Sequence, residues 1–180
     1  MNRDQAELMI GTGQTQRFHT ELTLRSQDVG QHCYGVFWLC YALTAGEMSN
    51  ALMLAAMSHD AGERWTGDLP GPTKLRMNLT AQFDAEEDRE LMTRVGFPRP
   101  VLKPTERAVL KLADAFDGAY YCLRELRMGN ATVRTMMENF LSYAHAVLAS
   151  RSAAVGGPVF GRANEHMKYL EEQVNGNKRG

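Results

Sequence analysis

Hydrophobic residues recur every three or four positions along most of the chain, which is the spacing of a helix that buries one face. The first repeat predicts a helix over residues 28–45, for which Asp28 is a suitable N-terminal cap. Ser49 caps a second predicted helix, which ends near His59. No stretch sustains the alternation of apolar and polar residues that a half-buried strand requires, so the predicted fold class is all-α.

Turn signals divide the rest of the chain. Two prolines and two glycines in residues 66–74, with the sequence TGDLPGPTK, predict a turn. Pro72 can open a third helix that continues to residue 95, and an irregular segment follows it. The other predicted elements are a helix that Thr105 starts and Asn130 ends, a helix over 132–150, a loop over 154–161 and a short helix over 162–174.

Length and composition indicate an ordinary soluble protein. The 180 residues fit one domain over 1–180, with a helical core over about 15–151 and a short C-terminal helix and polar tail over 161–180. The net charge of -1 provides no overall field that would hold a nucleic acid polymer or an anionic membrane. The N-terminus lacks the pattern of a secretory signal, and no apolar stretch is long enough to span a membrane, so we expect a cytoplasmic protein.

Two histidines lie where the helical repeat predicts burial. His32 is in line with apolar residues of the first predicted helix, and a single histidine in such a place is more often a core residue than a metal ligand. His59 and Asp60 stand at the end of the second predicted helix, where both side chains can reach one ion, and Glu63 follows one turn later. A cluster of salt bridges at the helix end is the alternative interpretation.

A carboxylate also interrupts the strongest apolar stripe. Asp114 lies within the segment LKLADAF, and carboxylates are rarely buried without a partner. A bond to a lysine or to a helix N-terminus would explain it, and Asp117 is a rival on a neighbouring part of the same face. Two histidines and two aspartates from three helices would form a mixed nitrogen and oxygen site for a divalent metal, with positions open for water and substrate.

The order H…HD…D and the pattern HDxxExxTGDxPxPxK over residues 59–74 resemble the HD-domain phosphohydrolase superfamily. Within it the chain is similar, over about residues 15–128, to bacterial 5'-deoxynucleotidases of the YfbR type and to compact phage dATP triphosphohydrolases of the DatZ type. The resemblance implies a helical bundle with a metal site between helices, and it favours Asp114 over Asp117 because LKLADAF matches the family pattern K-x-x-D-A. The implied metal ligands are His32, His59, Asp60 and Asp114.

The resemblance also implies roles around the metal. Glu63 would be the catalytic carboxylate, and Asp68 would assist proton transfer or hold the geometry of the site. Phe18 stands where these families usually have a tryptophan after the arginine, so a ring remains to exclude a 2'-hydroxyl. The residues implied to contact the substrate are Arg17, Phe18, Pro72, Lys74 and Lys111.

The function implied is metal-dependent hydrolysis of 2'-deoxynucleotides at the phosphorus bonded to O5'. The expected ion is zinc, cobalt or manganese, with a further magnesium ion when the substrate is a triphosphate. We expect a dATP triphosphohydrolase that releases deoxyadenosine and tripolyphosphate, with a 5'-deoxynucleotidase acting on monophosphates as the alternative. A non-catalytic nucleotide-binding module and a phosphodiesterase of signalling nucleotides are further alternatives, and the expected assembly is a homo-oligomer, either a dimer or a hexamer.

Overall fold

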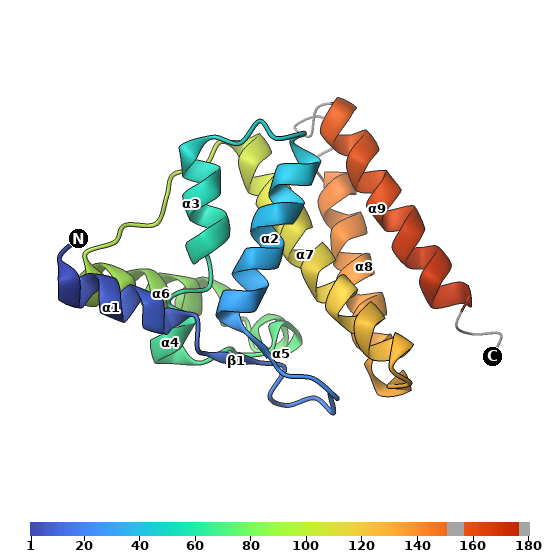
Figure 1. The fold of residues 1–180 in the computed structure, drawn as a ribbon, viewed down its shortest axis with the longest axis horizontal. Helices are drawn as coiled ribbons and strands as arrows, with labels where there is room; N and C mark the ends of the chain where they lie inside the picture. Colours follow the sequence, from blue (N-terminus) through green and yellow to red (C-terminus); the bar gives the residue numbers. More distant parts are fainter. Residues whose placement is uncertain (151–156, 177–180) are drawn as a thin grey trace.

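A computed structural model describes residues 1–150 and 157–176, and the all-α prediction is confirmed (Figure 1). None of the helices in these two ranges is both long enough and apolar enough to cross a membrane. A two-stranded antiparallel ribbon and a short 3-10 turn accompany the helices. The elements are α1 (Arg3–Thr12), β1 (Gln16–Arg17), β2 (Gln27–Asp28), α2 (Val29–Leu43), α3 (Asn50–Ser58), α4 (Glu63–Thr66), α5 (Gly71–Arg76), α6 (Thr80–Val95), α7 (Pro104–Arg127), η1 (Ala131–Val133), α8 (Arg134–Ser150) and α9 (Gly157–Gly176).

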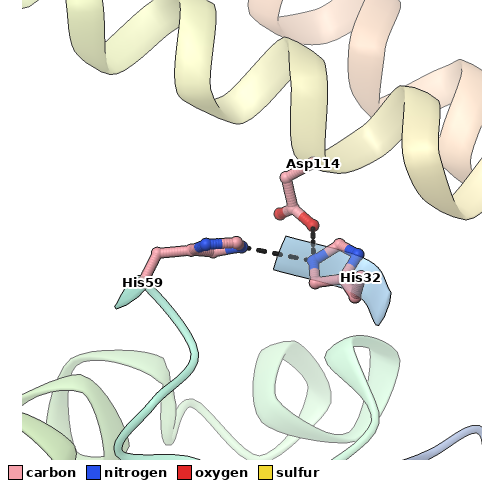
Figure 2. Close-up of side chains that lie close together, drawn as sticks. All are labelled: His32, His59 and Asp114. Carbon is pink, nitrogen blue, oxygen red and sulfur yellow. Dashed lines mark hydrogen bonds and ion pairs between the residues drawn. The ribbon is translucent and has the colours of Figure 1, made fainter. Parts of the chain in front are cut away.

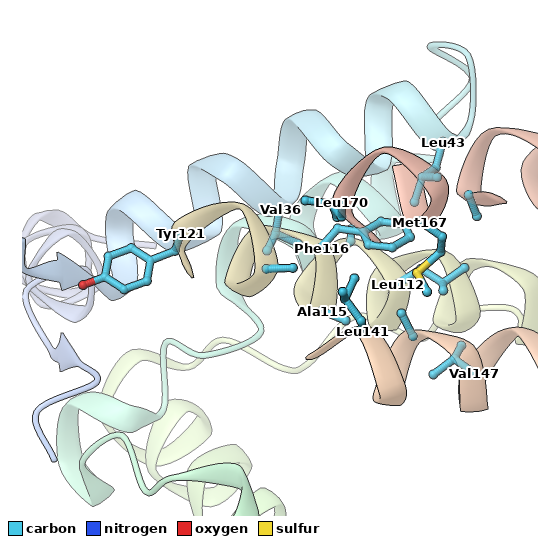
Figure 3. Close-up of a cluster of buried hydrophobic side chains, with 14 of the residues drawn as sticks. Val36, Leu43, Leu112, Ala115, Phe116, Tyr121, Leu141, Val147, Met167 and Leu170 are labelled. Atoms are coloured by element: carbon cyan, nitrogen blue, oxygen red, sulfur yellow. The ribbon is translucent and has the colours of Figure 1, made fainter. Parts of the chain in front are cut away.

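Helix α7 is the centre of the packing. It lies against α2 and α8 along much of its length and also contacts α3 and α9. Helices α1, α4 and α6 contact one another on the side of α2 that faces away from α8 and α9 (Figure 1). The apolar stripe predicted for this helix is buried against these neighbours (Figure 3). Fully buried side chains in this cluster include Val36, Leu43, Leu112, Phe116 and Leu170.

The start of α2 is fixed by the predicted cap. The Asp28 carboxylate accepts the N–H of Gln31 at 2.7 Å, and the Gln31 side chain accepts the N–H of Asp28 at 3.3 Å. The ribbon pairs Gln16 with Asp28 and Arg17 with Gln27, so it holds Arg17 close to the first turn of α2. The site described below depends on this arrangement.

The prediction of one helix from Pro72 to residue 95 is wrong, because the chain breaks between α5 and α6. Asn78 has a left-handed φ of 55°, a conformation that asparagine tolerates better than most residues. The N–H of Leu79 donates to the carbonyl of Lys74 at 2.8 Å, and the N–H of Asn78 donates to Leu75 at 3.1 Å. This pattern is a Schellman motif, which ends α5 one turn after Lys74.

The predictions for the two ends of the chain also need correction. Helix α1 was not predicted; Asn2 and Gln5 form a capping box that starts it. The predicted loop over 154–161 is wrong from residue 157 onward, because α9 begins at Gly157 and Pro158 is tolerated in its first turn. Residues 154–156 and the last four residues of the predicted tail lie outside the described residues.

Helix α4 approaches α6 so closely that only glycine fits at position 62. A Cβ on Gly62 would lie 2.8 Å from Cα of Glu87 and nearer still to its Cβ. We therefore expect Gly62→Ala to lower the free energy of unfolding by about 1–3 kcal/mol, the usual effect of overpacking. Urea denaturation measures this change. The control is Gly71→Ala, whose Cβ would meet no atom within 4 Å in the part of the chain that the structure describes. Equal stability of the two variants would contradict the close approach.

Candidate metal centre

His32, His59 and Asp114 turn toward one point from three helices (Figure 2). His32 lies in the first turn of α2, His59 caps the C-terminus of α3, and Asp114 lies in the middle of α7. His32 Nε2 is 3.2 Å from His59 Nε2 and 3.2 Å from Asp114 Oδ1. One ligand atom from each of the three residues lies within 4.8 Å of the others, so the three could hold a metal ion.

Asp60 completes this group of side chains. Its Oδ2 lies 3.4 Å from His32 Nε2, and its Oδ1 lies 3.5 Å from His59 Nε2. Asp60 directly follows His59 at the end of α3, where the side chains of two adjacent residues can reach the same point. Ligand atoms around an ion with bonds of about 2 Å lie roughly 3–3.5 Å apart, which agrees with these separations.

The other nitrogen of each histidine is held from behind. His32 Nδ1 lies 2.7 Å from Asp117 Oδ2, and His59 Nδ1 lies 3.2 Å from the carbonyl oxygen of Ala56. Both partners are acceptors, so Nδ1 carries the proton and the Nε2 lone pair faces the centre in the neutral rings. Asp117, the rival for the position of Asp114, lies behind His32 and not at the centre.

The carboxylates make the centre favourable for positive charge. Burial and the charge of Arg17 lower the pKa of His32, but hydrogen bonds to two aspartates outweigh them and raise it to about 8. Burial likewise lowers the pKa of His59, while the charge of Asp60 raises it, and the result is about 9. Burial raises the pKa of Asp60, but the charges of His59, His32 and Arg17 hold it well below its usual range. Protons or a divalent cation can supply the charge that this centre requires.

Arg17 is buried beside the centre. Its Nη1 lies 2.7 Å from Asp60 Oδ2, its side chain is 9% exposed, and its Nε has no hydrogen-bond partner among the described residues. A buried donor without a partner is unfavourable, and an anion bound at the centre could accept it. The implied contact with a phosphate is therefore compatible with the position of Arg17.

Glu63 also has a buried polar atom without a partner. Its Oε2 makes no hydrogen bond within residues 1–150 and 157–176, and its Oε1 lies 3.8 Å from Lys74 Nζ. Burial, followed by the charges of Asp60 and Asp68, raises the pKa of Glu63 far above its usual value. A carboxyl group in such surroundings retains its proton at neutral pH in the metal-free site, and a cation bound beside it would lower its pKa toward the range that acid–base catalysis requires.

Comparison with known proteins identifies the family. No protein-family model matches the chain. Two proteins named 5'-deoxynucleotidase YfbR, from Salmonella paratyphi B and Salmonella newport, are each 30% identical to it over 162 residues, covering 76% of this chain and 81% of theirs. The chain belongs to the YfbR family of HD-domain phosphohydrolases. The resemblance drawn from HDxxExxTGDxPxPxK is confirmed.

A solved structure agrees with this assignment at the level of the fold. The Cyanophage S-2L HD phosphohydrolase DatZ, bound to dA and one catalytic Zn²⁺ ion, superposes on this HD-domain phosphohydrolase with a TM-score of 0.61. The two chains are 17% identical, and the match covers 94% of this chain and 96% of DatZ. The predicted HD-domain helical fold is therefore confirmed.

Phe18 and Asp68 are joined by a hydrogen bond and lie beside Arg17 in this HD-domain phosphohydrolase. Asp68 Oδ2 accepts the N–H of Phe18 at 3.3 Å, and Phe18 has a left-handed φ of 54°. The Phe18 ring stacks on Tyr121 with centroids 4.7 Å apart, and the guanidinium carbon of Arg17 lies 5.3 Å from its centroid. The ring is thus fixed against α7, and Asp68 holds the strained backbone that presents it.

Two residues implied to contact the substrate make no polar contact with the candidate metal centre among the described residues. Pro72 and Lys111 are both exposed, and neither makes a hydrogen bond or ion pair to the other site residues within the described part of the chain. Lys111 lies one turn before Asp114 on α7, so its flexible side chain remains within reach of a long substrate.

Glu87, a buried carboxylate paired with Lys74, was not among the predicted site residues. Glu87 is 3% exposed, and its Oε1 lies 3.4 Å from Lys74 Nζ. It belongs to the acidic run DAEEDRE over 84–90, and it alone of these acids lies at four-residue spacing in line with Phe83, Leu91 and Val95, so the helical repeat could have revealed its burial. Its contact with Gly62 and its ion pair with Lys74 are revealed only by the tertiary structure.

Proposed function

We propose that this HD-domain phosphohydrolase cleaves the phosphate ester at O5' of 2'-deoxynucleotides. The observation that carries the proposal is the position of His32 Nε2, at 3.2 Å from both His59 Nε2 and Asp114 Oδ1. Together with Asp60 these residues would hold one divalent transition metal, and a mixed nitrogen and oxygen set suits zinc, cobalt or manganese. The family relationship to proteins named 5'-deoxynucleotidase supports the substrate class.

The surrounding residues suit the hydrolysis of a phosphate ester. A bound divalent ion supplies acidity to water and neutralises phosphoryl oxygens. Glu63, with its free Oε2, would orient the attacking water and exchange its proton. Arg17, with its free Nε, would donate to a phosphoryl oxygen as negative charge develops there, and Lys74 would assist from α5.

A deoxynucleoside monophosphate is the substrate that this charge distribution favours. Arg17 is already paired with Asp60, and Lys74 lies between Glu63 and Glu87, so the cations near the centre are largely balanced. A triphosphate brings more negative charge than the monophosphate and would need further cations. The name of the two Salmonella relatives supports the same choice.

Hydrolysis of dATP to deoxyadenosine and tripolyphosphate is the second candidate. Lys111 favours it, because this exposed lysine makes no ion pair among the described residues and lies one turn from Asp114. A longer phosphate chain, with an accompanying magnesium ion, could engage it. Both candidates place the same phosphorus atom at the metal, so the product identifies the enzyme.

The substrate preference can be tested by product analysis of zinc-loaded protein with dAMP, AMP, dATP and ATP. We expect inorganic phosphate and deoxyadenosine from dAMP. We expect AMP to react about 5- to 150-fold more slowly, because a 2'-hydroxyl buried without a partner costs about 1–3 kcal/mol. Tripolyphosphate from dATP would establish the second candidate. Equal rates for zinc-loaded and chelator-treated protein would contradict both.

A further inference from the structure

Asp117 is a buried carboxylate that reaches the metal centre only through His32. Its side chain is 6% exposed, and its Oδ2 lies 2.7 Å from His32 Nδ1. The same oxygen accepts a hydrogen bond from Gln27 Nε2 at 3.0 Å. One carboxylate oxygen therefore receives two donors, one from β2 and one from α2.

The backbone of α2 leaves space for this carboxylate. Gly35 lies one turn after His32, and a Cβ at this position would be 2.8 Å from Cγ of Asp117 and closer to its Oδ1. The carboxylate thus occupies the volume that a side chain at position 35 would need. His32, Gln27 and Gly35 together fix the place of Asp117.

We propose that Asp117 is a positioning residue that sets the tautomer and direction of His32 for metal binding. Because the carboxylate accepts the Nδ1 proton, the lone pair of the neutral ring lies on Nε2, the atom that faces His59 and Asp114. The negative charge also makes Nε2 a stronger donor to the ion. Two acids three positions apart on α7 thus have different roles. Asp114 would bind the ion, and Asp117 would orient His32 from the other side of its ring. The inference rests on the proposed metal site.

The first test compares zinc affinity by chelator competition in wild-type protein, Asp117→Asn and Asp117→Ala. Loss of an orienting partner lowers metal affinity about 10- to 100-fold, and we expect Asp117→Ala to reach the upper part of this range. Asp117→Asn keeps an acceptor oxygen and the side-chain volume, so its loss should be smaller. The hydrogen-bonded Nδ1 proton of His32 should be visible by NMR in the zinc-loaded wild type and absent in Asp117→Ala.

The second test moves Asp117 without changing it. Gly35→Ala should displace the carboxylate and lower zinc affinity, although alanine is the better helix former and neither residue 35 nor its new methyl group touches the ion. The matched control is Gly161→Ala on α9, where a Cβ would meet no atom of the described residues within 4 Å. Circular dichroism of the metal-free variants separates loss of folding from loss of affinity.

The outcomes separate this inference from the proposed function. Wild-type protein that binds no zinc would overturn both. Wild-type protein that binds zinc, with Asp117→Ala and a folded Gly35→Ala binding it equally tightly, would overturn the inference alone. Loss of stability in Asp117→Ala without loss of zinc affinity would also overturn it, because a purely structural carboxylate predicts that result.

Discussion

Asp114→Asn is expected to lose the bound metal and to lower kcat/KM for deoxynucleotides by roughly 10³-fold or more. The substitution removes the negative charge that α7 contributes to the centre, and the metal supplies several kcal/mol of transition-state stabilisation that would be lost with it. Asparagine preserves the size of the side chain, which is 38% exposed, so α7 should remain folded. Metal analysis of the purified variant and steady-state kinetics measure the two effects.

Asp60→Ala would test the ligand set less clearly than Asp114→Asn, because it would also destabilise the fold. Asp60 is the ion-pair partner of the buried Arg17, and removal of one partner from a buried pair costs about 3–5 kcal/mol of stability. Loss of activity in Asp60→Ala would therefore combine unfolding with metal loss. Asp84→Asn, at an exposed acid on α6, is the control for a change of net charge. Full metal occupancy in Asp114→Asn would remove this residue from the ligand set.

Glu63→Gln is expected to keep one metal per chain and to lower kcat about 10²- to 10⁴-fold, the usual contribution of a positioned acid–base group. Glutamine matches the shape of the buried side chain but cannot exchange the proton. Lys74 should stay in place, since Glu87 Oε1 lies 3.4 Å from its Nζ. Metal content, KM and kcat of the variant together distinguish loss of chemistry from loss of binding.

Glu87→Gln is the matched control for Glu63. Both acids are buried and both lie near Lys74, but Glu63 alone has an oxygen that lacks a hydrogen-bond partner among the described residues. We expect Glu87→Gln to lower stability more than turnover. If the two variants lost kcat equally, the effect of Glu63 would be explained by the position of Lys74. Near wild-type kcat in Glu63→Gln would make Glu63 merely structural.

The sequence predicted those parts of the site that local rules control. The cap at Asp28 and the apolar stripe after it determine where α2 begins and that His32 turns inward, and both follow from spacing. The meeting of His32 with His59 and Asp114 does not follow from spacing, because it depends on how α2, α3 and α7 pack. Only the resemblance carried by HDxxExxTGDxPxPxK predicted that meeting.

The remaining features depend on close approaches between distant segments. Gly62 packs against Glu87, and Gly35 packs against Asp117. Nothing in the sequence around either glycine indicates that a distant residue lies so close to it. The break at Asn78 was missed because a Schellman motif needs a left-handed residue, and asparagine is a weaker signal for it than glycine. The single domain over 1–180 and the homo-oligomer stay predictions.

Anomalous X-ray diffraction at the zinc absorption edge, from crystals of the wild-type protein and of Asp114→Asn grown with zinc, tests the metal site most directly. We expect one strong peak in the wild type, bonded to Nε2 of His32, Nε2 of His59 and carboxylate oxygens of Asp60 and Asp114, and no such peak in Asp114→Asn. A wild-type peak at other residues, or no wild-type peak, would contradict the proposed metal site.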